Sequence, residues 1–363
     1  MRKEIIMLGT SFESQGGIST VVNAYREAGL FKRWPIYYIK THATTGQFEK
    51  LLLFFKAFFE FIKKLFLCKV ALVHIHTASR NSFWRKTPFI IACLFARIPY
   101  IVHLHGAEFM LFFHAESGFI MRKIIRTIFN KASYVVVLSS QWQERVESIC
   151  GNKNIVVIFN SVIDPCSNCS RFSEEGQSLL FLGAIGRRKG IYELVEAMSI
   201  VCKKHPEIVL YCGGTGDISG VECLIKKYNL EGRVKMLGWV GGEAKLVLLK
   251  STMAYVLPSY NEGLPMGILE AMSYGKPVIS TPVGGIPDAI DDGVQGFLVK
   301  PGSVDDLASV IVKICDDKKM RLEMGVASRR KYEDCFSPDK IIPKIESLYG
   351  ELGAVPCNKL AAN

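Results

Sequence analysis

The chain has 363 residues, of which 49% are hydrophobic and 22% are charged, and its formal net charge is +11. This length corresponds to about two domains, and the composition supplies large apolar cores, which excludes a disordered or low-complexity chain. The 11 cysteines are scattered along the chain, which favours a reducing cytoplasm over a disulfide-stabilised secreted protein.

The first half of the chain alternates short apolar runs with helix-length segments. The runs predict buried strands at residues 4–9, 36–40, 70–76, 100–105, 134–139 and 154–160. Such alternation indicates a parallel sheet covered by helices on both faces. The first run is too short for a signal peptide, and no run reaches the roughly 18 apolar residues that a transmembrane helix needs.

Residues 48–67, which begin "FEKLLLFFKAFFEFIKKLF", predict a helix that is apolar around most of its circumference. On a helical wheel, Glu49, Lys56, Glu60 and Lys63 share one narrow stripe, and most of the rest is Phe, Leu and Ile. A helix of this kind is either buried on several sides or lies in a bilayer interface with its lysines at the headgroups.

The positive charge is concentrated in the first half. Residues 1–165 hold 21 Lys and Arg against 10 Asp and Glu, whereas the remaining residues hold 24 of each. Arg122, Lys123 and Arg126 add to this basic character on another predicted helix. The sequence contains no basic recognition helix and no aromatic-interleaved RNA motif, so a membrane surface explains the charge better than nucleic acid.

A polar, turn-rich stretch near residues 165–177 predicts a linker between two domains. After it, the strand pattern resumes at residues 178–183, 208–214, 233–237, 253–258, 277–281 and 296–300. We therefore predict an α/β fold of two doubly wound domains, with ligands at the C-terminal ends of the strands. Within the linker, Cys166 and Cys169 have redox or zinc spacing, but no second Cys or His pair lies at a matching distance.

Unusual residues follow the predicted strands of the first half. Gly16 and Gly17 come after the first strand, where they let the backbone approach a ligand closely before a helix. The fourth strand ends in "HLHGAEF". We interpret His105 in that motif as a functional residue, and His74 and His103 either as core residues or as residues that support the functional ones.

Two further strand ends in the second half carry ligand-binding signals. Arg187, Arg188 and Lys189 open a helix after a strand, which suits neutralisation of a diphosphate. The next strand ends in "CGGTGD", where Gly214 belongs to a tight turn. Each signal alone is weak, because a basic triplet is usually solvated and a glycine pair usually marks an ordinary turn.

The segment "NEGLPMGILEAMSYG", residues 261–275, predicts a helix from Pro265 to Tyr274. Its first turn has unpaired N–H groups at the positive pole of the helix dipole, which favours a phosphate. Glu270 lies more than a turn further along, where its carboxylate can accept hydrogen bonds from a diol, and Glu262 precedes the helix. Without further evidence, a second interpretation is equally good: Glu270 is a solvated helix carboxylate, Glu262 is a turn residue, and neither binds a ligand.

This segment and its continuation, "KPVISTPVGGIPDAI", resemble the E-x7-E region of the family-4 glycosyltransferases. The motifs "GGIS", "HLHGAEF", "FLGAIGRRKGIYELVEAM", "LYCGGTGD", "LGWV" and "FNSVIDP" extend the resemblance over essentially the whole chain. The resemblance implies the GT-B fold, in which two Rossmann-like domains face each other across a cleft, and retaining transfer from a nucleotide sugar. The implied parts are an acceptor-binding domain at 1–165, a nucleotide-sugar-binding domain at 166–335 and a helix at 336–352 that returns to the first domain.

The resemblance also implies roles for matching residues. Glu270 would hold the ribose hydroxyls, Glu262 would contact the transferred sugar, and Lys189 would bind the diphosphate. His105 would lie beside the reacting sugar. The other implied donor contacts are Gly16, Gly17, Arg187, Arg188, Gly214, Trp239, Gly263, Leu264, Pro265 and Met266.

Two positions depart from the family pattern. Ala184 stands where the family usually has an arginine, and we expect Arg187 or Arg188 to replace it. Ser161 stands where the family commonly has the glycine of an Asn-Gly turn, which leaves the hinge conformation open.

The sequence therefore predicts a cytoplasmic enzyme, peripheral at the inner face of the cell membrane, which it contacts through residues 48–67. We expect it to transfer a sugar from a nucleotide-sugar co-substrate to a lipid-linked glycan acceptor in surface-polysaccharide biosynthesis. The chain contains no Asp-x-Asp triplet, so we expect neither a metal nor another cofactor. Two alternatives remain, a nucleotide-sugar epimerase of the same fold and a non-catalytic membrane-surface binding protein.

Overall fold

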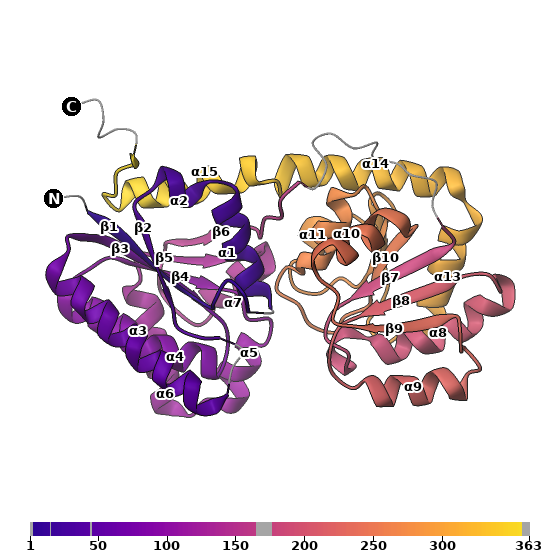
Figure 1. Cartoon of the computed structure of the whole chain (residues 1–363), viewed down its shortest axis with the longest axis horizontal. Helices are drawn as coiled ribbons and strands as arrows, with labels where there is room; N and C mark the ends of the chain where they lie inside the picture. Colours follow the sequence, from indigo (N-terminus) through magenta and orange to yellow (C-terminus); the bar gives the residue numbers. More distant parts are fainter. Residues whose placement is uncertain (1–2, 15, 44–45, 165–175, 358–363) are drawn as a thin grey trace. The chain divides into compact units, whose positions relative to one another are not determined.

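The fold is taken from a computed structural model that describes residues 3–14, 16–43, 46–164 and 176–357. The chain divides into two compact units (Figure 1). Unit 1 contains Met1–Ile163 and Pro338–Asn363, and unit 2 contains Asp164–Ser337. The limits predicted from the sequence were 165 and 335. The Cys166 and Cys169 pair, with most of the predicted linker, lies outside the described residues.

Unit 1 is built on a parallel six-stranded sheet with the order β2-β1-β3-β4-β5-β6. All six strands predicted from the first half are present. They are β1 (Glu4–Gly9), β2 (Ile36–Lys40), β3 (Val70–Thr77), β4 (Tyr100–Leu104), β5 (Tyr134–Val137) and β6 (Ile155–Val157).

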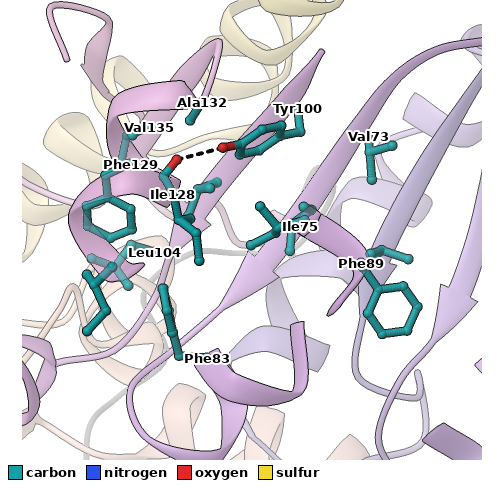
Figure 2. Packing of buried hydrophobic residues seen from close by; sticks show 14 of the residues in the cluster. Val73, Ile75, Phe83, Phe89, Tyr100, Leu104, Ile128, Phe129, Ala132 and Val135 are labelled. Atoms are coloured by element: carbon teal, nitrogen blue, oxygen red, sulfur yellow. Dashed lines mark hydrogen bonds between the residues drawn. The ribbon is translucent and has the colours of Figure 1, made fainter. Parts of the chain in front are cut away.

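Helices cover both faces of this sheet. They are α1 (Gly17–Glu27), α2 (Leu30–Arg33), α3 (Gln47–Leu67), α4 (Asn81–Ala96), α5 (Phe109–Leu111), the π-helical turn η1 (Phe112–Glu116), α6 (Phe119–Lys131), α7 (Ser140–Glu147) and α15 (Pro338–Glu351). One core cluster joins α3, α4 and α6 to the same face of the sheet through Phe61, Phe89 and Phe129. Figure 2 shows Phe89 and Phe129 in this cluster. In that cluster, the Tyr100 hydroxyl donates a 2.7 Å hydrogen bond to the Ile128 carbonyl.

The opposite face of the sheet is covered by α1 and by the C-terminal helix α15. The hydroxyl of Tyr349 on α15 lies 2.7 Å from Nδ1 of His74 on β3, and its ring packs edge-on against Trp34. An ion pair of 2.7 Å between Arg33 and Glu346 adds a second contact. The last helix therefore completes the core of unit 1, although it follows unit 2 in the sequence.

Unit 2 repeats this architecture with the strand order β12-β11-β10-β7-β8-β9. Its strands are β7 (Ser178–Leu182), β8 (Val209–Gly213), β9 (Val234–Gly238), β10 (Ala254–Leu257), β11 (Val278–Ser280) and β12 (Gly296–Leu298). Its helices are η2 (Arg187–Lys189), α8 (Ile191–Lys204), α9 (Ile218–Lys227), α10 (Gly242–Ser251), α11 (Met266–Ser273), α12 (Ile286–Ala289), α13 (Val304–Asp316) and α14 (Lys318–Cys335). From β7 the sheet continues through β8 and β9 in one direction, and from its neighbour β10 it continues through β11 and β12 in the other. The topological switch point therefore lies between β7 and β10.

Candidate active site

Two loops meet at the switch point of unit 2, one after β7 and one after β10. The first leads through η2 into α8, and the second leads into α11. A backbone hydrogen bond of 2.8 Å from the Tyr260 amide to the Arg188 carbonyl ties the loops together. Open α/β sheets bind ligands at this position, so the loops define the candidate site.

Glu262 is the centre of a charged cluster between these loops. It is only 5% exposed. Its Oε1 accepts hydrogen bonds from Lys189 Nζ at 2.6 Å and from Ser259 Oγ at 2.7 Å. Arg188 lies 3.7 Å from Oε2 and donates a 3.0 Å hydrogen bond to the Asn261 carbonyl. The predicted residues Lys189, Arg188 and Glu262 therefore lie together, and the two cations offset the cost of burying the carboxylate.

The structure distinguishes the two arginines that we considered as replacements at Ala184. The Arg188 guanidinium is directed to the Glu262 loop. The Arg187 guanidinium is exposed and lies over the Tyr192 ring, 5.8 Å from its centroid. Of the two, Arg188 is therefore the one placed at the site.

Helix α11 begins immediately after this cluster, at Met266, with Pro265 as its N-cap. The first turn carries no acidic side chain, so the positive end of the helix dipole is not neutralised locally. One turn further, Glu270 accepts a 2.6 Å hydrogen bond from Lys245 Nζ on α10, and its side chain is 15% exposed. Glu270 is therefore mostly buried and paired with Lys245. The alternative interpretation of Glu270 as a solvated helix carboxylate is wrong.

Glycines bring the loops of the site into close contact. Gly284 has φ +60, and a Cβ at this position would lie 2.0 Å from the Glu262 carbonyl oxygen. Gly214 has φ +155, and a Cβ there would lie 1.7 Å from the Gly183 carbonyl oxygen. The structure thus gives Gly214 a packing role between strand ends in addition to the donor contact expected from the resemblance. Trp239 follows β9 and is 52% exposed.

Unit 1, described by itself, contains a stack of four histidines on neighbouring strands. His74 and His76 lie on β3, and His103 and His105 lie on and just after β4, with His105 Nε2 only 2.9 Å from His76 Nδ1. His74 and His103 are buried, as predicted for core residues. Burial lowers the pKa of His105 to about 3, so this imidazole is neutral at physiological pH. A neutral imidazole can donate or accept a hydrogen bond to a sugar hydroxyl without carrying charge.

The remaining predicted residues of unit 1 lie at the start of α1. Gly16 is the N-cap, with φ 141, and α1 begins at Gly17. A Cβ on either glycine would meet nothing within 4 Å, so neither is required by packing within the described residues. Open space beside a strand-to-helix turn is compatible with close approach of a ligand to the backbone.

Two family models match the chain. The model described as "Glycosyltransferase Family 4" matches residues 6–164, and "Glycosyl transferases group 1" matches residues 167–331. Together they account for both units. The chain belongs to the family-4 glycosyltransferases. It is therefore a transferase enzyme.

Among related proteins, this glycosyltransferase is 26% identical over 264 residues to N-acetyl-alpha-D-glucosaminyl L-malate synthase of Bacillus anthracis, a match that covers 70% of this chain and 68% of the relative. It is 28% identical over 228 residues to the putative teichuronic acid biosynthesis glycosyltransferase TuaC of Bacillus subtilis, covering 60% of this chain and 55% of TuaC.

Solved structures show the same fold. HepE of Anabaena, in complex with UDP and glucose, superposes with a TM-score of 0.76 at 18% identity, covering 96% of this chain and all of HepE. Sucrose-phosphate synthase of Thermosynechococcus elongatus gives 0.77 at 22% identity, covering 97% and 99%. The two Rossmann-like units thus form a GT-B glycosyltransferase. Among its described residues, no helix has both the length and the apolar character to cross a bilayer.

Three residues at the site were not singled out from the sequence. Ser259 and Lys245 contact the two glutamates, and His76 contacts His105. A signal was available only for His76, because "HIH" and "HLH" end neighbouring strands with the same spacing. Nothing in the sequence distinguishes Lys245 from the other lysines on exposed helices.

Proposed function

We propose that this glycosyltransferase is a retaining, metal-independent enzyme that moves a sugar from a nucleotide-sugar donor to a lipid-linked glycan acceptor in surface-polysaccharide biosynthesis. The observation that carries the donor assignment is the cluster of Lys189, Arg188 and Glu262 directly before the N-terminus of α11. It combines cations for a diphosphate with a carboxylate for sugar hydroxyls.

The chemistry requires stabilisation of the negative charge that forms on the leaving diphosphate. Lys189, Arg188 and the α11 N-terminus are fixed before the reaction and stabilise that charge by preorganised electrostatics. The acceptor oxygen attacks on the face that the diphosphate leaves, and a diphosphate oxygen takes its proton, which retains the anomeric configuration. No residue needs to act as a covalent nucleophile, and no Asp-x-Asp triplet is present to hold a metal.

Related proteins agree with this donor class. HepE is described in complexes with UDP and with UDP-glucose, and TuaC is assigned to teichuronic acid biosynthesis. The malate synthase shows that related enzymes also use small acceptors. The choice of a lipid-linked acceptor therefore depends on features of this chain.

Helix α3 is the feature that favours an acceptor at a membrane. Only Ala57 and Phe61 on this helix are buried. The opposite side exposes large apolar side chains, with exposures from 48% to 84%: Phe48, Leu51, Leu52, Phe55, Phe59 and Phe66. The interpretation that α3 is buried on several sides is therefore wrong.

Two neighbouring helices on the same side of the sheet expose further apolar residues. These are Phe95 on α4 and Phe119, Ile120 and Met121 on α6. Large exposed apolar side chains that gather on one side of a sheet favour contact with a membrane or a protein. Lys56 and Lys63 are exposed beside these side chains and can reach anionic headgroups, whereas Lys64 pairs with Glu4 at 2.8 Å and is not available for them.

The donor assignment is tested by thermal unfolding of the full chain with UDP-, GDP-, ADP- and dTDP-sugars, in the presence of EDTA. We expect one nucleotide class to stabilise the wild type, because a ligand of the folded state raises its stability. Glu270→Ala should lose that stabilisation. The control Glu323→Ala removes an exposed helix glutamate of unit 2 and should keep it. Stabilisation of Glu270→Ala to the wild-type extent would refute the proposed ribose contact.

The acceptor assignment is tested by product analysis with the stabilising donor. The proposed enzyme transfers the sugar to a lipid-linked acceptor in detergent or vesicles. Conversion of the donor to its epimer without acceptor would instead identify the enzyme as an epimerase, and donor binding with neither product would favour a binding protein.

A further inference from the structure

A cluster of basic side chains, for which the described part of the chain provides no acidic partner, lies at the C-terminal edge of the unit 1 sheet. Lys86, on the second turn of α4, is 1% exposed. Its Nζ has no hydrogen-bond partner among the described residues, and the same holds for Nε of Arg85 and Nδ1 of His42. His42 follows β2, and α4 follows β3. We name Arg85, Lys86 and His42 the edge cluster.

The members of the edge cluster affect one another electrostatically. Burial, followed by the charges of Arg85, Lys50 and Lys86, lowers the pKa of His42 to about 4. Burial and the charge of Arg85 lower the pKa of Lys86 to about 7. The charge of Lys86 also contributes to the low pKa of His76, after burial and the neighbouring histidines. Each of these charge effects is repulsive.

The described residues contain no carboxylate that pairs with Arg85 or Lys86. Ion pairs elsewhere in unit 1 connect Arg33, Lys64 and Arg80 to glutamates. Burying an ammonium group without a partner is strongly unfavourable. A methionine would fill the same volume without this cost, so packing alone does not account for a lysine.

The loop after β1 adds uncharged donors at the same edge of the sheet. Thr10 Oγ1 and Ser14 Oγ are buried and have no partner among the described residues. Because β1 lies between β2 and β3, this loop emerges between the elements that carry His42 and Lys86. Cations together with hydroxyl donors match the several strong acceptor oxygens of a phosphate group.

We propose that the edge cluster is a subsite for a phosphate group of the acceptor, with Lys86 as its central ligand. As an acceptor subsite it rests on the proposed function, which places the charged donor contacts in unit 2 and the acceptor in unit 1, where Gly16, Gly17 and His105 are the expected donor contacts. The same chemistry would bind a lipid phosphate or a soluble phosphate ester. The experiment therefore includes both sources.

The test is thermal unfolding of the full chain with inorganic phosphate, with glycerol 3-phosphate, and with farnesyl phosphate against its uncharged counterpart farnesol. The variants are Lys86→Met, Lys189→Met to remove the donor-site cation, and Lys131→Met as a control on the exposed surface of α6. We expect phosphate compounds to stabilise the wild type, Lys189→Met and Lys131→Met. In Lys86→Met the apparent affinity should fall at least about tenfold, since a charge-assisted contact is lost.

Lys86→Met should also unfold at the same or a higher temperature than the wild type in the absence of ligand, because it removes an unpaired buried cation. A lower unfolding temperature would show that Lys86 has a structural partner, and would overturn the proposal. So would an undiminished phosphate effect in Lys86→Met that disappears in Lys189→Met, because the anion would then occupy the donor site. Absence of any phosphate effect on the wild type would overturn it as well.

The two sources give different results if the subsite exists. Equal stabilisation by glycerol 3-phosphate and farnesyl phosphate assigns the subsite to the phosphate group alone. Stabilisation by farnesyl phosphate only, with none by farnesol, assigns it to a lipid phosphate. The nucleotide-sugar series is independent of these measurements. If nucleotide sugars do not bind but Lys86→Met loses the phosphate effect, the proposed function fails and the anion site remains.

Discussion

Replacing Lys189 with methionine should destabilise unit 2, because Glu262 would remain buried without its nearest cation. The carboxylate is 5% exposed and its Oε1 lies 2.6 Å from Lys189 Nζ. Removing one member of a buried ion pair typically costs about 3–5 kcal/mol. Ser259 and Arg188 still contact the carboxylate at 2.7 and 3.7 Å, so we expect the lower end, about 3 kcal/mol.

A double-mutant cycle separates this pair from its surroundings. Glu262→Gln keeps the shape of the side chain but not its charge, and we expect it to cost about 1–2 kcal/mol because Lys189 retains some access to water. The double variant should be less destabilised than the sum of the single variants, by about 1.5–3 kcal/mol. Denaturant unfolding of the wild type and the three variants, followed by circular dichroism, measures these differences.

Additive effects, within about 0.5 kcal/mol, would show that Lys189 and Glu262 are not energetically coupled. The ion pair would then not be the element that holds the two loops of the site together. A second readout addresses binding. Lys189→Met should lose stabilisation by a nucleoside diphosphate, whereas Glu262→Gln should keep it, because the lysine is then released from its carboxylate.

Four further predictions concern other parts of the protein. Lys245→Ala should weaken donor binding less than Glu270→Ala, as measured by calorimetry, because the lysine only orients the carboxylate that we expect to bind ribose; equal losses would contradict this. Phe55→Ser combined with Phe59→Ser should reduce binding to anionic vesicles at least about tenfold in a sedimentation assay without lowering stability, since both side chains are exposed. Acidification should destabilise the wild type, because burial lowers the pKa of His74 to about 3 and the unfolded chain therefore takes up more protons between pH 6.5 and 3; the slope is at most about 1.4 kcal/mol per pH unit for each such histidine, and a flat unfolding curve between pH 7 and 5 would contradict it. Turnover should persist in excess EDTA, and its loss would refute metal independence.

The sheets could be predicted from the sequence because parallel strands buried on both faces are continuous apolar runs. "VALVHIH" and "YVVVLS" need no alternation to be recognised, and both form interior strands of the sheet. The strand ends then follow from the apolar runs, and the start of the helix in the E-x7-E segment follows from Pro265, since proline is favoured at the beginning of a helix. Apolar runs and prolines are local features of the chain, so a single sequence is enough to recognise them.

Pairing between side chains could not be predicted in the same way. Lys189 meets Glu262 across 73 residues, and Lys245 meets Glu270 from a different helix. Either lysine could have pointed into solvent without changing the hydrophobic pattern. The sequence also left the environment of α3 open, because the same apolar circumference fits a buried helix and an interfacial helix.

The two units differ in whether the cations of their candidate sites have carboxylate partners, and this difference affects how tightly each unit binds an anion. In unit 2 the key cations already have carboxylate partners, so a donor diphosphate must share or displace existing ion pairs, and part of its binding energy offsets their loss. In unit 1 Lys86 has no such partner within the described residues, so an acceptor phosphate would relieve repulsion without breaking an ion pair. Weak donor binding in the absence of acceptor is then compatible with tight binding of an anionic acceptor, and measured affinities of the two ligands should differ in that direction.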